Sequence, residues 1–95
     1  MKNVAFNGYV QKVCDLFNIT QTELFTKSKR RDIVDARHLL YFLCHKRPMQ
    51  IRYIQEYMGN NGYKIGHSTI IHGIEQVKEK VTEDTDYELV YNQLA

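Results

Sequence analysis

The 95-residue sequence has one proline, no tryptophan and only two cysteines, which excludes a proline-rich chain and a disulfide-stapled scaffold. It has no apolar run near the roughly 20 residues that cross a bilayer. It also lacks the apolar block of a signal peptide, so we expect a cytosolic protein with no membrane contact. Cys14 and Cys44 are far apart among apolar residues, which favours reduced, buried thiols. The length predicts one domain, 1–95.

The patterns that catalysis and metal binding require are also missing. His67 and His72 are five residues apart, not the four that share a helix face, and the cysteines form no Cys-x-x-Cys pair. The Gly-x-x-x-x-Gly-Lys-Ser/Thr run of a phosphate loop does not occur. We therefore expect no enzyme, no metal, no cofactor and no small-molecule substrate.

Charge is unevenly distributed, although the net charge is only +2. Five of the thirteen basic residues lie between Lys27 and Arg37. Basic residues also occur at Lys46, Arg47, Arg52 and Lys64, whereas acidic ones gather after Glu75, at Glu79, Glu83, Asp84, Asp86 and Glu88. This asymmetry is typical of an oriented binder of a polyanion, although a solvated charged face would explain the same pattern.

Apolar residues recur at helical spacing along most of the chain, and no useful stretch alternates as a strand does. After a partly frayed segment over 1–8, we expect helices over about 9–18, 21–25, 32–45, 49–58 and 67–81, and a last one capped by Thr82 or Asp84. Thr20 and Glu23 predict a capping box, Pro48 fits a helix start, and Gly59 predicts a helix stop. The fold class is all-α, with five or six short helices, the fourth and fifth forming a helix-turn-helix.

The fifth predicted helix combines an apolar face with a polar first turn. Its inward stripe is apolar and consists of Ile70, Ile74, Val77 and Val81. Its first turn, His67, Ser68 and Thr69, is small and polar. Such a turn suits a helix that enters the DNA major groove, where hydroxyls reach base edges and a threonine methyl touches thymine. The alternative is that Ser68 is simply an N-cap.

Three groups of residues are similar to those of a known family. They are Lys27-Ser28-Lys29-Arg30-Arg31-Asp32-Ile33-Val34-Asp35-Ala36-Arg37, then Met58-Gly59, and then His67-Ser68-Thr69-Ile70-Ile71-His72. Together they resemble the C-terminal DNA-binding domain of the bacterial chromosomal replication initiator DnaA, over about residues 10–94. The resemblance implies a Trp-repressor-like helical fold, double-stranded DNA as partner, and a role in replication initiation or its regulation, with replication proteins as further partners.

The resemblance also implies roles for single residues. Lys29 matches a basic residue that reaches the minor groove, and His67 and Ser68 match the base-reading pair, followed by Thr69. Arg37 matches a phosphate-binding arginine; its place opposite the apolar stripe predicts that it is exposed. Further candidates for contact with DNA are Lys27, Arg30, Arg31, His38 (where the family usually has glutamine), His45, Lys46, Gln50, Ile51 and Lys64, with the backbone N–H groups of Gln50 and Ile51 facing phosphate.

Two departures from the family put its target sequence in question. Gly66 stands where the family has an aspartate that can accept a hydrogen bond from cytosine. The connection before the fifth helix is about three residues longer and holds Tyr63 and Lys64. Since no ATPase motif is present, we expect a stand-alone DNA-binding module or a fragment. The alternatives are a transcription regulator, or a protein-interaction adaptor or inhibitor that docks through its acidic end.

Overall fold

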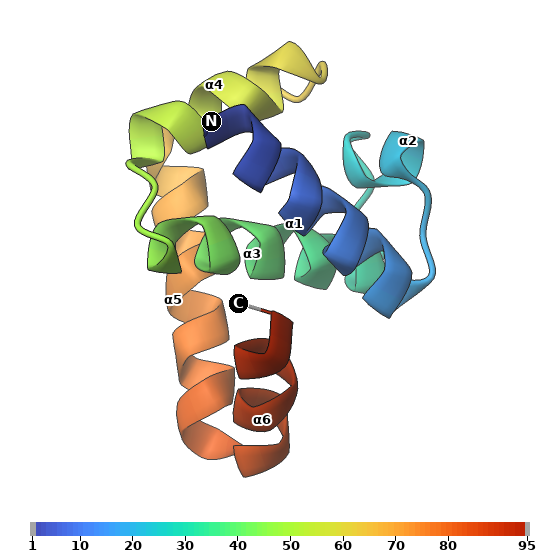
Figure 1. Ribbon diagram of the computed structural model, residues 1–95. Coiled ribbons are helices and arrows are strands. Elements are labelled where there is room, and N and C mark those ends of the chain that lie inside the picture. The colour runs from blue at the N-terminus through green and yellow to red at the C-terminus, as the bar shows by residue number, and fades with distance from the viewer. Residues whose placement is uncertain (1, 95) are drawn as a thin grey trace.

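The computed structural model describes residues 2–94, and every regular element among them is a helix. Figure 1 shows α1 crossing α3, with α4 lying across one end of the molecule and α6 turning back alongside the long α5. The helices are α1 Lys2–Phe17, α2 Gln21–Leu24, α3 Arg31–Lys46, α4 Ile51–Asn60, α5 His67–Glu83 and α6 Thr85–Leu94. The predicted all-α class with five or six helices is confirmed. None of these described helices is long and apolar enough to cross a membrane.

Helix α3 is the centre of the core, because it packs against both α1 and α5. Its predicted stripe is fully buried and consists of Ile33, Ala36, Leu40, Leu43 and Cys44. Leu39 and Tyr41 are buried as well, so that α3 is enclosed around most of its circumference. Cys14 and Cys44 are free and buried, as predicted, and burial raises the pKa of the Cys44 thiol to about 12.

The N-terminal segment is helical, so the prediction of a frayed stretch before Tyr9 is wrong over residues 3–8; Met1 lies outside the described residues. Phe6 is 1% exposed, and its ring centroid lies 5.4 Å from that of Tyr57 in α4. This contact joins distant parts of the sequence, so local periodicity does not reveal it. Helix α1 ends at Phe17, close to the predicted end, and Asn18 turns the chain with a φ of 54°.

The short helix α2 has the predicted capping box. The backbone N–H of Glu23 donates to Thr20 Oγ1 at 3.1 Å, and the backbone N–H of Thr20 donates to Glu23 Oε1 at 2.9 Å. The second hydrogen bond is the main cause of a lowered Glu23 pKa. The box fixes the direction in which the chain leaves α1.

The limits of α4 differ from the prediction at both ends. Pro48 follows a cis peptide bond and lies outside the helix, which has Gln50 as its N-cap and Ile51 as its first residue. At the other end Gly59 is not the stop, because α4 continues to Asn60. The positive φ that a helix stop requires is found at Gly62 instead, at 85°.

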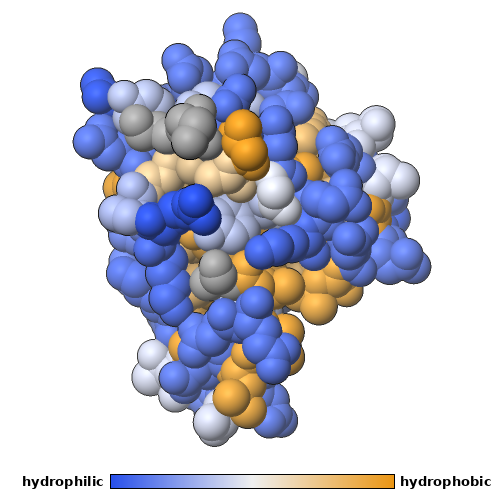
Figure 2. Space-filling view, in the orientation of Figure 1, coloured by the Kyte–Doolittle hydropathy of each residue, from blue (hydrophilic) through white to orange (hydrophobic). Residues whose placement is uncertain are grey.

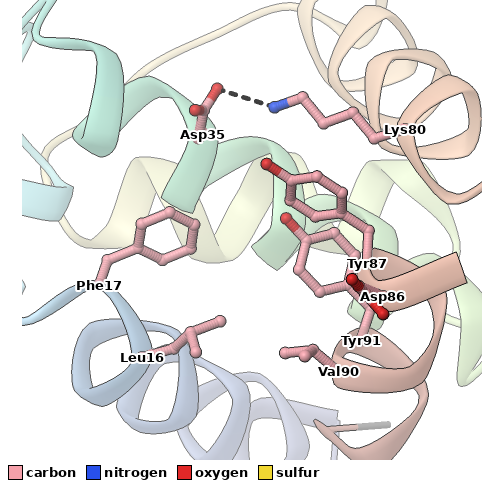
Figure 3. A pocket seen from close by; sticks show the side chains of 8 residues that line it. All are labelled: Leu16, Phe17, Asp35, Lys80, Asp86, Tyr87, Val90 and Tyr91. Carbon is pink, nitrogen blue, oxygen red and sulfur yellow. Dashed lines mark hydrogen bonds and ion pairs between the residues drawn. The ribbon is translucent and has the colours of Figure 1, made fainter. Parts of the chain in front are cut away.

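The C-terminal helix α6 is capped by Asp84, one of the two predicted caps: its Oδ1 accepts from the backbone N–H of Asp86 at 2.9 Å. Tyr91 anchors α6 in the core. Beside it a groove of about 340 Å³ is lined mainly by apolar side chains, including Leu16, Tyr87 and Val90 (Figure 3). Apolar surface is visible over this region in Figure 2. The ion pair between Lys80 Nζ and Asp35 Oδ1, 3.1 Å long, joins α5 to α3 at its edge.

Candidate nucleic-acid interface

The connection between α2 and α3, residues 25–30, is here called the basic loop, and it lies beside the first turn of α5. A hollow of about 290 Å³ separates them. It is lined by Lys27, Ser28, Lys29, Val34, Arg37, His38, Tyr41, Tyr63 and Thr69. The fold therefore brings Lys27 and Lys29 to the same side of the molecule as Thr69, about forty positions later in the sequence.

The first turn of α5, residues 67–69, is here called the reading tip. His67, Ser68 and Thr69 are all exposed. The N-cap of α5 is Gly66, which makes no side-chain cap, so the alternative that Ser68 serves as the N-cap is wrong. The predicted inward stripe anchors the helix through three buried residues and one half-buried one, Ile70, Ile74, Val77 and Val81. The side chains of the reading tip are thus free for an outside partner.

The four basic residues of the run from Lys27 to Arg31 are not equivalent. Arg30 Nε lies 2.8 Å from Asp32 Oδ1, and Arg31 Nε lies 3.5 Å from Asp35 Oδ2. Lys27 and Lys29 are exposed and form no ion pair within residues 2–94. The two lysines therefore carry the uncompensated positive charge at the hollow, and both line it.

Arg37 is buried at 5% exposure, so the prediction that it is exposed is wrong. Its Nε donates to the carbonyl of Leu24 at 2.9 Å, Nη1 donates to that of Ser28 at 3.1 Å, and Nη2 donates to that of Thr26. The carbonyl groups of an irregular loop need donors, and a guanidinium supplies several in a fixed plane. Three of its five N–H groups thus bind the chain itself, which leaves Arg37 poorly placed to hold phosphate.

His38 lies half-buried between α3 and α5, and its ring centroid is 5.9 Å from that of the exposed His72 in an edge-to-face arrangement. Burial lowers the pKa of His38, and the neighbouring His72 lowers it further. The two rings form a small imidazole cluster next to the hollow, which His38 also lines.

The remaining predicted residues lie outside the hollow. His45 and Lys46 are exposed at the end of α3, where Lys46 Nζ donates to Asn92 Oδ1 of α6 at 2.7 Å. Gln50 and Ile51 open α4, whose N-cap makes no side-chain hydrogen bond, and Lys64 is exposed in the connection between α4 and α5.

Sequence reasoning missed Tyr41 as part of the hollow, and it placed Tyr63 only in the connection before the fifth helix. Tyr41 sits in α3 beside apolar residues, so nothing in its local sequence separates it from the core. The Tyr63 ring lies over the Arg37 guanidinium, with 4.5 Å between the ring centroid and the guanidinium carbon. This contact brings the connection between α4 and α5 against helix α3, which periodicity does not predict.

The helix pair α4–α5 with an exposed polar first turn, next to a loop with two unpaired lysines, defines a helix-turn-helix domain with a cationic reading side. Residues 10–77 match the family described as bacterial DnaA protein helix-turn-helix, and the chain belongs to that family. This confirms the resemblance noted in the sequence.

Individual relatives are chromosomal replication initiator proteins DnaA. That of Leptospira biflexa is 26% identical over 93 residues, which cover 96% of this chain and 20% of the relative. That of Flavobacterium psychrophilum is 32% identical over 83 residues, which cover 83% of this chain and 16% of the relative. The chain thus spans about a fifth of the length of the curated relatives it matches. No solved structure matches it significantly.

Proposed function

We propose that this chain binds a specific sequence in double-stranded DNA and takes part in replication initiation or its regulation. The observation that carries the proposal is the hollow itself, where Thr69 of the exposed reading tip lies together with Lys27 and Lys29, which form no ion pair within residues 2–94. Family membership supports DNA binding as the activity of the domain. An adaptor that uses only the acidic end would leave this arrangement without a purpose.

In the proposed complex α5 enters the major groove by its N-terminal end. His67 and Ser68 offer a ring nitrogen and a hydroxyl to base edges, and Thr69 offers a hydroxyl and a methyl group. All three side chains are exposed, and α5 continues for 17 residues as a rigid support packed on α3. Because Gly66 brings no carboxylate, recognition of cytosine by an acceptor at that position is absent.

The backbone contacts come from two further places. Lys27 and Lys29 line the hollow together with Thr69 of the reading tip, and from there Lys29 can reach a narrow minor groove and Lys27 a phosphate. The N-terminus of α4 at Ile51 has no side-chain cap, so that its first N–H groups can donate hydrogen bonds to a phosphate oxygen. Arg37 is reassigned from phosphate contact to support of the loop.

The domain so described is a non-catalytic binding module. It would occupy DNA sites in the cytosol, and any ATP-driven step at an origin would belong to another module or another protein. Contacts with replication proteins remain part of the proposal, since the relatives are initiators several times longer than this chain.

Selection of bound fragments from a random duplex pool tests the proposal and yields the preferred site. On that site His67→Ala should weaken binding by about 1–3 kcal/mol, and on unrelated duplexes by much less. Lys27→Ala should weaken binding to every duplex alike, and should reduce the slope of log K against log salt by about one phosphate's share, roughly 0.9.

The two variants control each other, because both replace exposed side chains, Lys27 at the hollow and His67 in the reading tip. Selection that enriches no sequence would contradict specific binding. An equal loss on all duplexes for His67→Ala would contradict the placement of α5 in the major groove.

A further inference from the structure

The connection between α4 and α5 reaches the basic loop indirectly, because the ring of Tyr63 lies against Arg37 of α3, which donates to the loop. Tyr63 is half-buried, and its ring centroid lies 4.5 Å from the Arg37 guanidinium carbon. Arg37 in turn donates to the carbonyl of Leu24 at the end of α2 and to the loop carbonyls of Thr26 and Ser28. Tyr63, Arg37 and the loop are therefore stacked in that order, and Tyr63 and Arg37 both line the hollow.

Tyr63 is itself fixed from the α4 side. Its backbone N–H donates to the carbonyl of Met58 at 3.0 Å, in the last turns of α4. Two residues later, the carbonyl of Ile65 accepts from Gln55 Nε2 at 2.8 Å. The connection is thus pinned to α4 on both sides of Tyr63, so that its ring is an anchored surface for the guanidinium.

From this arrangement we infer that Tyr63 is a positioning residue. It acts through Arg37 to hold the basic loop in a fixed position relative to the reading tip. The ring covers a cation that is only 5% exposed, and cation–π attraction is strongest where water is excluded. Covering the guanidinium also shields its hydrogen bonds to the loop carbonyls from competing water.

The consequence for binding rests on the proposed function. A loop ordered in advance presents Lys27 and Lys29 to the DNA backbone without a further loss of conformational entropy on binding. If the connection is longer than the family pattern, as the resemblance implies, Tyr63 belongs to the added stretch, and this contact would give the added residues a role. They would couple the turn of the helix-turn-helix to the loop beyond the hollow.

The inference predicts how substitutions at Tyr63 act on the free protein. The loop contains Lys27, Lys29 and Arg30, so trypsin cleaves there when the loop opens. Tyr63→Leu, which keeps apolar bulk but removes the ring, should raise the rate of cleavage in the loop by about 3- to 30-fold. Tyr63→Phe keeps the ring face and should behave as the parent does. Tyr87→Ala, which removes an exposed ring on α6, is the matched control and should change nothing in the loop.

The same variants are then compared for duplex affinity on the selected site. Tyr63→Leu should lose affinity by a factor similar to its gain in cleavage, with Tyr63→Phe near the parent. Circular dichroism at the assay temperature shows that each variant is folded. Unchanged loop cleavage in folded Tyr63→Leu would overturn the inference.

Equal affinity losses in Tyr63→Phe and Tyr63→Leu would also overturn it, since the hydroxyl would then contact DNA directly. If the parent protein binds no duplex at all, the proposed function fails, whereas the cleavage rates still decide whether Tyr63 holds the loop.

Discussion

A glycine decides how closely α5 approaches α3. A Cβ built at Gly73 would lie 2.7 Å from Tyr41 Cδ2 and 2.9 Å from His38 Cδ2. Both distances are shorter than real Cβ contacts. Tyr41 is 1% exposed, so its ring has no free space into which it could move. The missing side chain at Gly73 thus permits the helix contact that positions the reading tip.

We therefore expect Gly73→Ala to destabilise the protein by about 1–3 kcal/mol, because the added methyl group overpacks the α3–α5 contact. Gly59→Ala is the matched control: it lies inside α4 with nothing within 4 Å of the added Cβ. It should stabilise by about 0.5–1 kcal/mol through helix propensity. Urea unfolding measures both changes, and destabilisation by Gly59→Ala as large as that by Gly73→Ala would refute the packing argument.

At the level of elements, the α3–α5 contact also encloses a titratable group. His38 of α3 faces His72 and Lys80 of α5, with Asp35 and Arg31 of its own helix nearby. Burial is the largest cause of its lowered pKa, followed by His72, while Asp35 opposes them. The folded state therefore favours neutral His38 more than the unfolded chain does.

This difference predicts the direction of a pH effect. The unfolded chain, with an ordinary pKa of 6.5, binds a proton at His38 before the folded protein does. The free energy of unfolding should therefore be lower in acid and rise with pH, reaching its full value above about pH 6.5. His38→Gln should flatten this rise, and His45→Gln, at an exposed position, should leave it intact. Urea unfolding between about pH 5 and 7.5 measures the effect; an unchanged slope in His38→Gln would exclude His38 as its source.

At the scale of the whole molecule, charge is divided along the axis of α5. The basic loop lies near its N-terminal end, whereas exposed acidic residues follow from its second half onward: Glu75, Glu79, Glu83, Asp84, Asp86 and Glu88. Glu83 lies 16 residues beyond His67, which is about 24 Å along a helix. That distance exceeds the Debye length of about 8 Å at physiological salt.

Neutralising the acidic end should therefore affect binding only when screening is weak. The double variant Glu79→Gln, Glu83→Gln should tighten binding to every duplex by about two- to fivefold near 10 mM salt, and should have almost no effect near 150 mM. The preferred sequence should not change, because neither residue is near the reading tip. Equilibrium titrations at the two salt concentrations measure this, and an altered sequence preference would contradict the assigned polarity.

Much of the fold could be predicted from the sequence, because it depends on neighbours within a few residues. The capping box of Thr20 and Glu23, the buried stripe of α3 and the inward stripe of α5 all follow from spacing alone, and the structure has each of them. The exposed chemistry of the reading tip also follows, since polar residues stand opposite that stripe.

The site was less predictable, because its geometry depends on contacts between distant segments. Spacing placed Arg37 on the solvent side of its helix, but the end of α2 and the basic loop lie over it, accept its hydrogen bonds and bury it. The start of α1 was missed for the same reason, as Phe6 is held by Tyr57. Helical periodicity describes one helix in isolation and contains no information about what covers its outer face.

The sequence by itself determined the all-α class, most of each helix apart from the start of α1 and the limits of α4, the helix-turn-helix and the polar first turn of α5, since hydrophobic periodicity and capping are local. Only the tertiary structure decided which basic side chains remain available to a partner. Lys27 and Lys29 are exposed at the hollow, whereas Arg37 donates its hydrogen bonds to backbone carbonyls and is covered by Tyr63. The physical reason is that a charge in an irregular connection takes whichever partner the packing of the whole chain brings within reach.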